Sequence, residues 1–437
     1  MRIGYCSPFN PMKSGISDFS EELVVALSKY AEIVVFSPVR PCKQEIMDTF
    51  EVHDLSELSN KNMRESLDEI VYHVGNNAQC HADIVKMLKL YPGIVELHDF
   101  GLHHLLAEIF SKSQKWEEYI QLAEYCHGRK GRKIAEEFVH GLSDAPWDRF
   151  PLEMSMNRTI LEKAKAVIVH SEFTKQMVLG LFPDKPIINI MLHSMDIVDD
   201  PVGWKAFCRN HLDLKNDKSI LGSFGFATQS KRILPILDAL GKCKKEGKDF
   251  QFILVGEVSE RLSIQQEISK HDLDENVVIT GFASLDDFKF YMGACDFCLN
   301  LRYPTQGENS GSLHRMFGMG KPAIVTDVGT FSDYPDDVVL KVRYDEHEVD
   351  DIYHAISLLT GNRKELQKRS KAALDYAKTY CDLEKNAKQY AEFFQQIHTH
   401  TWQPDYEDTL ITGLCELGLT DDEYSEHIYS KFYAAMQ

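Results

Sequence analysis

SILGSFG at residues 219–225 is the first of five short apolar runs that decide the fold class of this chain. The other four are FQFILVG (250–256), NVVITGF (276–282), DFCLNL (296–301) and PAIVTDVG (322–329). Helical patterns such as SLDDFKFYMGA (284–294) separate these runs. Continuous apolar runs of this length are typical of strands buried on both faces. The stretch therefore predicts five buried parallel strands, in an α/β domain of the Rossmann-like type.

The first half of the chain repeats the same alternation of strand and helix. Its apolar runs are RIGYC (2–6), EIVVFS (32–37), IVYHV (70–74), IVEL (94–97) and AVIV (166–169). After the first run, Phe19, Leu23 and Leu27 recur every four residues, and Ser17 is placed to cap the helix that they predict. A second Rossmann-like domain with a parallel sheet is therefore expected.

The chain is predicted to divide into two domains and a helical segment. Pro201 and Gly203 precede a restart of the strand and helix count, so the boundary is predicted near Asp200. Residues of about 111–165 are predicted to form a helical insertion, because no strand pattern interrupts them. The expected parts are an N-terminal domain over 1–200, a C-terminal domain over 201–381 and a C-terminal helical segment over 382–437.

Composition excludes several classes of protein. With 43% hydrophobic and 26% charged residues, the 437-residue chain has the profile of a globular protein rather than a disordered or fibrous one. Its 48 basic and 67 acidic residues give a net charge of -19, which argues against nucleic-acid binding. No apolar run approaches the roughly 18 residues of a membrane span, and the chain opens on a strand pattern rather than a signal segment. A cytoplasmic protein is therefore predicted.

The cysteines and acidic pairs do not predict a metal site. Of 10 cysteines, only Cys295 and Cys298 form a Cys-x-x-Cys pair, and no second pair accompanies them. We interpret them as small apolar residues of a buried strand in a reducing compartment, without disulfides. Asp272 and Asp274 precede a strand and are interpreted as a solvated turn.

In open α/β sheets, ligands bind beyond the carboxyl ends of the strands. Gly15 lies between the first strand and a helix, where a phosphate could approach the backbone amides; a plain turn glycine is the alternative. His98 directly follows the strand IVEL and is predicted to hydrogen-bond a substrate hydroxyl or a developing charge, with a packed histidine as the alternative. His103 and His104 are adjacent on a helix and would not converge on one metal ion.

In the second domain, Lys231 and Arg232 follow the first strand at a helix start. Two cations beside the positive end of a helix favour an anion site over a solvated pair. The loop RYPTQGENSGSLHRMFGMGKP (302–322) lies at the same sheet edge and places Glu308 just before a second helix start. There a diphosphate could lie on the helix amides while the Glu308 carboxylate accepts hydrogen bonds from sugar hydroxyls; simple helix capping is the alternative.

A basic run from Arg129 to Lys133 lies in the predicted helical insertion. It is either a solvated helix face or a site for a phosphorylated or lipid-linked acceptor or an anionic membrane surface. Peripheral association with the inner face of a membrane is therefore a further expectation.

Five segments together resemble the retaining glycosyltransferases of the group 1 family, which have the GT-B fold. They are VYHVGNN (71–77), PGIVELHDFGLHHLL (92–106), AVIVHSEFTKQ (166–176), NVVITGF (276–282) and RYPTQGENSGSLHRMFGMGKPAIVTDVGTFSDYPDDVVLKV (302–342). The resemblance extends from about Met1 to Phe394. It implies two Rossmann-like domains facing a cleft, with the last helices crossing back onto the first domain.

The resemblance also implies roles for individual residues. His98 matches the histidine beside the donor sugar, Lys231 the lysine that neutralises the diphosphate, and Glu308 the acidic residue that holds the donor sugar. The other residues matched to the donor site are Gly15 near the diphosphate, Phe282 and Ala283 beside the base, and Ser310, Gly311 and Ser312 as the phosphate cradle.

Two positions depart from the family pattern, which indicates a divergent branch. The usual arginine before the lysine is Phe226 here, so Arg232 or Arg302 is expected to replace its charge. The family's second glutamate, often a ribose ligand, falls at Arg315 or Met316.

The reaction implied is transfer of a hexose from a UDP- or GDP-linked donor to a hydroxyl of a glycan or lipid-linked acceptor, with retained anomeric configuration. Such enzymes commonly act in surface polysaccharide or lipopolysaccharide assembly. No metal or other cofactor is expected, because Lys231, Arg232 and the helix start at Ser310 would stabilise the departing diphosphate. The alternatives are a catalytically silent relative that serves as a binding or partner subunit, and a GT-B sugar-nucleotide epimerase.

Overall fold

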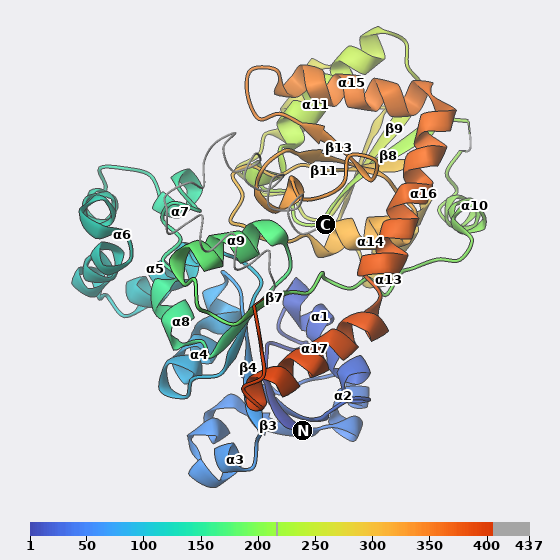
Figure 1. Ribbon diagram of the computed structural model, residues 1–437. Helices are drawn as coiled ribbons and strands as arrows, with labels where there is room; N and C mark the ends of the chain where they lie inside the picture. The colour runs from blue at the N-terminus through green and yellow to red at the C-terminus, as the bar shows by residue number, and fades with distance from the viewer. Residues whose placement is uncertain (216, 405–437) are drawn as a thin grey trace, which may run out of the picture. The chain divides into compact units, whose positions relative to one another are not determined.

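The computed structural model describes residues 1–215 and 217–404, which form two compact units (Figure 1). Unit 1 comprises Met1–Ile190 together with the described residues from Ala387 onward, and unit 2 comprises Met191–Asn386. The chain therefore enters the second unit earlier than the predicted boundary near Asp200. Of the predicted C-terminal helical segment, residues 405–437 lie outside the described residues.

Unit 1 is built on a seven-stranded parallel sheet with the order β3-β2-β1-β4-β5-β6-β7. Its strands are β1 (Arg2–Cys6), β2 (Glu32–Ser37), β3 (Glu51–Asp54), β4 (Glu69–Val74), β5 (Ile94–Leu97), β6 (Ala166–Val169) and β7 (Ile187–Asn189). The five predicted strands are confirmed, whereas β3 and β7 were missed. Both are short edge strands, and β3 is too polar to show an apolar run.

Helices on both sides of this sheet cover its apolar side chains. They are α1 (Gly15–Leu27), α2 (Gln44–Thr49), α3 (Lys61–Glu65), α4 (Ala78–Leu90), α9 (Glu172–Leu181) and the part of α17 (Leu383–His398) that follows Asn386, with a 3-10 helix η1 (Leu55–Ser59). The prediction that Ser17 caps the first helix is wrong. Helix α1 starts at Gly15 and is capped by Ser14, whose hydroxyl accepts from the amide of Ile16, while Ser17 donates to the carbonyl of Met12.

Between β5 and β6 the chain is helical and has a small core of its own. The helices are α5 (His103–Lys112), α6 (Trp116–Val139), α7 (Pro146–Arg149) and α8 (Arg158–Lys163). Helix α6 is broken at Gly128, whose φ of 64° places it in the left-handed region. Leu106, Tyr119, Ala123 and Met154 are among the residues of this core. In the described part of the chain, no helix is long and apolar enough to cross a membrane.

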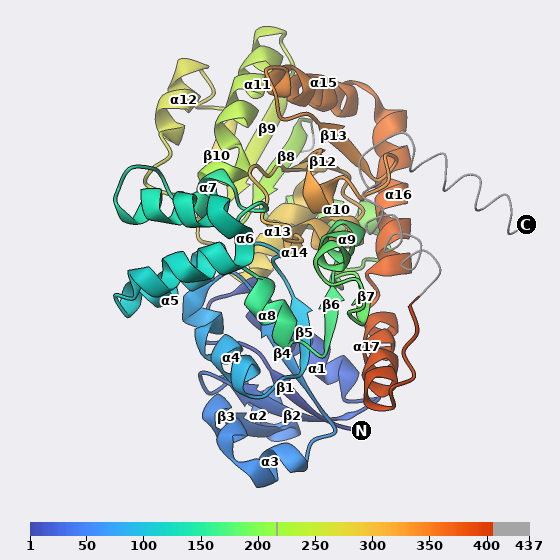
Figure 2. The ribbon, with the colours of Figure 1, turned by 60° about the vertical axis from the view of Figure 1, so that its left-hand side comes forward.

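Unit 2 is built on a six-stranded parallel sheet with the order β10-β9-β8-β11-β12-β13. Strands β8, β9 and β10 of this sheet can be followed in Figure 2. Its strands are β8 (Ser219–Phe224), β9 (Phe250–Val255), β10 (Val277–Gly281), β11 (Phe297–Asn300), β12 (Ala323–Thr326) and β13 (Val339–Val342). Strand β13 was not predicted. The prediction that all five strands are buried fails for β10, where Val278 and Ile279 are each 38% exposed because this strand forms the edge of the sheet.

The helices of unit 2 follow the strands as crossover connections. They are α10 (Pro201–His211), α11 (Ile233–Lys245), α12 (Ile264–Lys270), α13 (Leu285–Ala294), α14 (Gly311–Gly318), α15 (Glu348–Gly361) and α16 (Arg363–Tyr380), with 3-10 helices η2 (Gln229–Lys231) and η3 (Gly329–Phe331). Both sheets are parallel throughout, so the α/β class is confirmed. The carboxyl ends of their strands are the edges at which the predicted site residues lie.

Candidate active site

Lys231 lies over the carboxyl end of β8 in unit 2. Its ammonium donates a hydrogen bond to the carbonyl of Phe224, the last residue of that strand. Gly225, with a φ of 87°, makes this approach possible, because a Cβ atom there would lie 2.7 Å from Lys231 Nζ. Burial, assisted by the charge of Arg302, lowers the pKa of Lys231 well below its usual value. This is an ammonium whose charge is poorly compensated by the protein, as an anion site requires.

Glu308 is held rigidly by the loop between β11 and α14. Its Oε2 accepts hydrogen bonds from Thr305 Oγ1 at 2.8 Å and from the amide of Gln306 at 2.6 Å. Its Oε1 lies 3.3 Å from Arg302 Nε, in an ion pair whose carboxylate side chain is 16% exposed. Thr330 Oγ1 also donates to the Glu308 carbonyl at 2.6 Å. A carboxylate fixed in this way, and still in part accessible, can present its remaining lone pairs to ligand hydroxyls.

Helix α14 begins directly after Glu308. Ser310 is its N-cap, accepting from the amide of Leu313 at 3.3 Å, and Asn300 on β11 donates to the same hydroxyl at 2.8 Å. A Cβ at Gly311 would meet no atom within 4 Å, so the space beside this first turn is open. The first amides of a helix lack intrahelical partners, and at Gly311 and Ser312 they are available to an anion.

The structure separates the two arginines that were predicted to replace the charge missing at Phe226. Arg232 has a left-handed backbone conformation. Its guanidinium donates two hydrogen bonds to Glu348, from Nε to Oε1 at 2.8 Å and from Nη2 to Oε2 at 2.5 Å. The guanidinium also lies 4.8 Å from the ring centroid of Tyr344. Its charge is thus balanced within unit 2. Arg302 contacts Glu308 and acts electrostatically on Lys231, which places it in the predicted cluster.

The loop after β10 carries Phe282 and Ala283, as the sequence predicted. Phe282 is 73% exposed, and it follows Gly281, whose carbonyl accepts from the amide of Gly256 at 3.0 Å. This bond joins the loops that follow β9 and β10. An exposed aromatic ring at a sheet's carboxyl edge is a surface on which a planar ligand group can stack.

The position of the family's second glutamate has a structural role here. Arg315 forms an ion pair with Asp196, which also pairs with Lys289 at 2.9 Å, and Met316 is buried in the core of unit 2. Neither side chain offers a carboxylate to a ribose, so the departure from the family pattern is real.

In unit 1, Gly15 is the first residue of α1, and a Cβ there would meet nothing within 4 Å. The protein itself therefore does not require a glycine at this position. Gly15 thus lies at the start of a 13-residue helix capped by Ser14, between the first strand and that helix as the sequence predicted.

His98 lies at the carboxyl end of β5 and belongs to a cluster that the sequence did not predict. Glu96 Oε2 lies 3.3 Å from His73 Nε2, and Glu96 Oε1 lies 3.4 Å from His170 Nε2 and 3.8 Å from His98 Nε2. His73 Nδ1 and His98 Nε2 are 3.1 Å apart. Tyr390 of α17 donates to Glu96 Oε1 at 2.8 Å. We call these five residues the Glu96 cluster.

Strand pairing explains why the Glu96 cluster forms. His73 on β4 and Glu96 on β5 are register partners in adjacent parallel strands, so their side chains share one face of the sheet. His98 and His170 follow β5 and β6, which are also adjacent. The signal in the sequence was a polar residue near the carboxyl end of each of these runs, at positions that only the strand order brings together.

Burial dominates the pKa values of the Glu96 cluster. It lowers the pKa of His73 to about 4, against the charge of Glu96, and lowers the pKa of His98 well below its usual value. Burial acts to raise the pKa of Glu96, but the charges of His73 and His170 and the hydrogen bonds from His170 and Tyr390 outweigh it and lower that pKa. The carboxylate therefore stays ionised beside His73 and His98, two imidazoles that resist protonation.

Other histidines and acidic residues near His98 have hydrogen-bond partners outside the Glu96 cluster. Asp99 accepts from the amide of Asn76 at 2.7 Å, and His103 Nε2 lies 2.7 Å from the hydroxyl of Tyr119. Two groups in the described residues have ligand atoms within 4.8 Å of one another and could hold a metal ion by distance alone: His73, Glu96 and His98, and Asp238, Glu267 and His271. In the first group, His73 and His98 already face each other at hydrogen-bonding distance.

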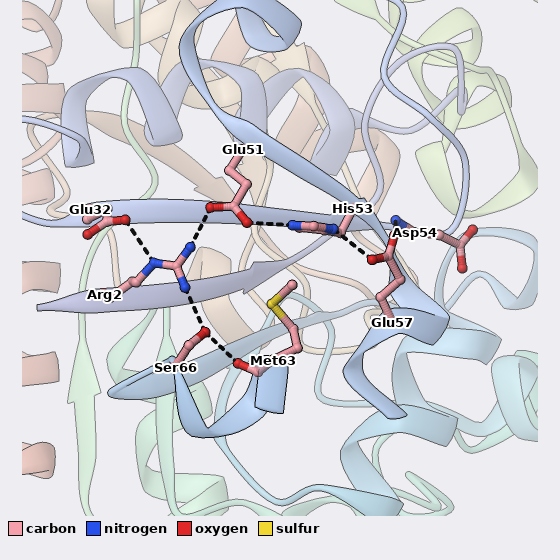
Figure 3. Close-up of polar contacts among 8 residues, drawn as sticks. All are labelled: Arg2, Glu32, Glu51, His53, Asp54, Glu57, Met63 and Ser66. Carbon is pink, nitrogen blue, oxygen red and sulfur yellow. Dashed lines mark hydrogen bonds and ion pairs between the residues drawn. The ribbon is translucent and has the colours of Figure 1, made fainter. Parts of the chain in front are cut away.

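The opposite, amino-terminal edge of the same sheet carries a different network (Figure 3). Arg2 at the start of β1 bonds to Glu32 Oε1 at 2.8 Å, to Ser66 Oγ at 2.7 Å and to Glu51. His53 lies between Glu51 at 2.7 Å and Glu57 at 2.9 Å. Burial acts to lower the pKa of His53, but its hydrogen bonds to the two glutamates raise it. These residues tie three strand starts together at the edge where ligands are not expected.

A comparison with known protein families matches part of unit 2. Residues 205–376 match the family model for glycosyl transferases group 1, a range that contains Lys231, Arg302 and Glu308. This match lies within unit 2, and over these residues it confirms the resemblance seen in the sequence. No curated protein sequence matches the chain.

Solved structures with a similar fold cover nearly the whole chain. HepE from Anabaena, in complex with UDP, is 15% identical with a TM-score of 0.63 and covers 91% of this chain and 100% of its own. Sucrose-phosphate synthase from Thermosynechococcus elongatus is 15% identical with a TM-score of 0.64, at 92% and 100% coverage. WaaG, a glycosyltransferase involved in lipopolysaccharide biosynthesis, is 12% identical with a TM-score of 0.58, at 90% and 99% coverage. At these identities the likeness establishes the fold, which is GT-B.

Proposed function

We propose that this protein transfers a hexose from a nucleotide-diphosphate donor to a hydroxyl group of an acceptor. The observation that carries the proposal is the grouping of Lys231, Arg302 and Glu308 at one carboxyl edge of unit 2, beside the start of α14. This grouping lies within the range that matches the group 1 family. It combines two cations, available helix amides and one fixed carboxylate, which together suit a phosphorylated sugar.

The proposed roles of these residues follow from their charges. As the bond between the sugar and the diphosphate breaks, negative charge grows on the leaving phosphate oxygens. Lys231, Arg302 and the amides of Gly311 and Ser312 would stabilise that charge, the task that a metal ion performs elsewhere, so we propose a reaction without a metal cofactor. Glu308 would accept hydrogen bonds from hydroxyls of the donor sugar. Buried charge-assisted bonds of this kind discriminate strongly between sugars.

Further residues would complete the donor site. Phe282 and Ala283 would border the base, Gly15 would admit the diphosphate to the amides at the start of α1, and His98 would bond a sugar hydroxyl near the reacting centre. Arg232 would act indirectly, because its charge is already paired with Glu348. Retention of the anomeric configuration is proposed on the family match rather than on a geometric feature.

The comparisons favour a particular donor and pathway. HepE was solved with UDP and with UDP-glucose, so a UDP-linked hexose is the first donor to test and a GDP-linked hexose the second. WaaG acts in lipopolysaccharide biosynthesis. We propose a glycan or lipid-linked acceptor in surface polysaccharide or lipopolysaccharide assembly, at the cytoplasmic face of a membrane.

The proposal is tested by incubating the full chain with UDP- and GDP-linked hexoses, with and without sugar acceptors. The expected result is release of the nucleoside diphosphate, unaffected by EDTA, and a product whose anomeric configuration by NMR equals that of the donor. Lys231→Ala should abolish release. Lys242→Ala should not, because Lys242 on α11 pairs with Asp350 away from the cluster. Donor conversion without diphosphate release would indicate an epimerase, and no turnover with any donor would indicate a silent relative.

A further inference from the structure

Two buried polar atoms of the Glu96 cluster face each other without a hydrogen bond in the described residues. They are His73 Nε2 and Glu96 Oε2, which are 3.3 Å apart. Both side chains are fully buried. An unsatisfied buried polar atom is costly, so the protein gains most when the two atoms bond to each other.

The direction of that bond determines the protons on the next histidine. An ionised carboxylate can only accept, so His73 Nε2 must carry the proton and donate. In a neutral imidazole the other nitrogen is then an acceptor. His73 Nδ1, 3.1 Å from His98 Nε2, therefore accepts a proton held by His98 Nε2. By the same rule, His98 Nδ1 is left unprotonated.

We propose that Glu96 and His73 are positioning residues that fix His98 in the tautomer with Nε2 protonated and Nδ1 as a hydrogen-bond acceptor. His98 Nδ1 makes no hydrogen bond within residues 1–215 and 217–404, and 8% of the side chain is exposed. This nitrogen is thus the atom that His98 offers to a ligand. As an acceptor it takes a proton from a hydroxyl group, so the site selects a sugar hydroxyl rather than a carbonyl or phosphate oxygen at this point.

We call the contacts from His98 to His73 and from His73 to Glu96 the relay. The relay requires the imidazoles of His73 and His98 to be neutral, and their surroundings favour that state. Burial lowers the pKa of His73 to about 4 and that of His98 well below its usual value. The titratable groups that face the relay are Tyr5 of β1, His81 of α4, Glu96 of β5, His170 after β6 and Tyr390 of α17. Among these, Glu96 is the acid that stays ionised.

His170 and Tyr390 explain how the buried carboxylate keeps its charge. Tyr390 donates to Glu96 Oε1 at 2.8 Å. His170 Nδ1 donates to the carbonyl of Ile190 at 2.8 Å, and its Nε2 lies 3.4 Å from Glu96 Oε1. Glu96 thus accepts from Tyr390 and has His73 and His170 beside its two oxygens, and an ionised carboxylate in this position can only accept a hydrogen bond from His73.

The first test reads the tautomer directly and needs no turnover. The full chain is labelled with 15N-histidine, and the His98 signals are identified by their loss in His98→Gln. The expected spectrum at neutral pH shows His98 Nε2 as protonated and Nδ1 as unprotonated. The opposite assignment, or an average of the two tautomers, would overturn the proposal. So would a stoichiometric metal ion found in the purified protein by mass spectrometry, since the same atoms would then be ligands.

The second test uses two variants of nearly equal shape. His73→Asn places an amide oxygen where Nδ1 was and keeps an acceptor for His98, whereas His73→Leu removes it. His73→Leu is expected to leave His98 as a mixture of tautomers and to lower kcat about 10- to 100-fold, with a smaller change in donor KM. His73→Asn is expected to keep both the His98 tautomer and kcat of the unmodified protein. Equal tautomers and equal kcat in the two variants would contradict the relay.

The functional part of this inference rests on the proposed glycosyl transfer, but the two can fail separately. If the protein turns over no nucleotide sugar, the proposed function fails, while the His98 tautomer still decides the relay. If His73→Leu does not fold, the spectrum of the unmodified chain decides it alone. Glu69→Gln provides a control for loss of a buried carboxylate, because Glu69 pairs with Lys165 at the amino end of β4 and should leave the His98 signals unchanged.

Discussion

Two carboxylates, Glu96 in unit 1 and Glu308 in unit 2, have opposite surroundings. Glu96 lies within strand β5, is completely buried and faces three histidines and a tyrosine. Glu308 lies in a loop, is partly exposed, and is held by Thr305, the amide of Gln306 and Arg302. The first carboxylate is surrounded by groups of the protein itself, whereas the second keeps lone pairs for a ligand.

The two carboxylates are therefore suited to different roles, one to supporting another residue and one to contacting a ligand. A buried carboxylate cannot reach a substrate, so Glu96 acts through His98 and also contributes to folding. A loop carboxylate beside cations and helix amides can contact a substrate and contributes little to the core. Substitutions of the two should therefore separate activity from stability.

The largest effect is expected at the Glu308 site. Lys231→Ala or Glu308→Gln should lower kcat/KM about 10²- to 10³-fold, because each removes a group aimed at the donor. The unfolding midpoint in urea should change little, since neither side chain belongs to the core of unit 2. Lys242→Ala is the matched control and should retain activity. A large loss of stability in Glu308→Gln, with normal kcat/KM in the folded fraction, would remove the distinction between the two carboxylates.

Glu96→Gln should produce the reverse pattern. Removing the charge leaves His170 and His73 without their buried acid, and breaking such a group costs about 3 kcal/mol in the free energy of unfolding. Urea unfolding monitored by circular dichroism measures the change. An unfolding midpoint equal to that of the unmodified protein would contradict the predicted contribution of the Glu96 carboxylate to stability.

The two histidine networks of unit 1 should respond to pH with opposite signs. The pKa of His73 is about 4 in the folded state and near 6.5 when unfolded, so the unfolded chain binds the extra proton between these values. Stability should fall as pH drops from about 6.5 to 4, by roughly 3 kcal/mol for this one group. His73→Asn should show a shallower loss over that window in urea unfolding.

His53 is the matched comparison at the amino edge of the same sheet. Its folded pKa is raised, so its contribution is present below the unfolded pKa of about 6.5 and is lost as pH rises through the folded value. His53→Gln should therefore reduce stability in acid and have no effect at high pH. A steeper acid loss in His73→Asn than in the unmodified protein would reverse the assigned sign.

The smallest effect is expected at the position where the family has its second glutamate. Arg315→Met removes the ion pair with Asp196, but Asp196 keeps Lys289, so the free energy of unfolding should fall by only about 1 kcal/mol. The donor KM should not change, because Arg315 is proposed to support the fold rather than the ribose. An increased KM would instead place Arg315 in the donor site.

The sequence predicted those features of the fold and of the candidate site that depend on a local pattern of residues. Apolar runs located the longer strands, and the loop from Arg302 to Pro322 located Glu308 and the start of α14, because strand and helix signals are read over a few neighbouring residues. The short strands β3, β7 and β13 were missed because their sequences, EVHD, IIN and VLKV, are too polar or too short to form a continuous apolar run.

The rest depended on which strands lie side by side. Glu96 lay unnoticed within IVEL, and only the register of β4 with β5 brings it against His73. Likewise, the ion pair between Arg232 and Glu348 joins residues far apart in the chain, so the sequence could not show that this arginine is already neutralised. The sequence could identify candidate ligands of the donor, but not the buried residues that orient them.

The most direct test of the central claim is the binding of UDP and GDP to the full chain, measured by calorimetry and by the rise in melting temperature. One diphosphate should bind without added metal and stabilise the protein by about 2.7 kcal/mol at a hundredfold excess over Kd. Lys231→Ala and Glu308→Gln should weaken binding of the corresponding nucleotide sugar, while Lys242→Ala should not. Equal binding by all four proteins, or no binding of either diphosphate, would contradict the assignment of the donor site to Lys231, Arg302 and Glu308.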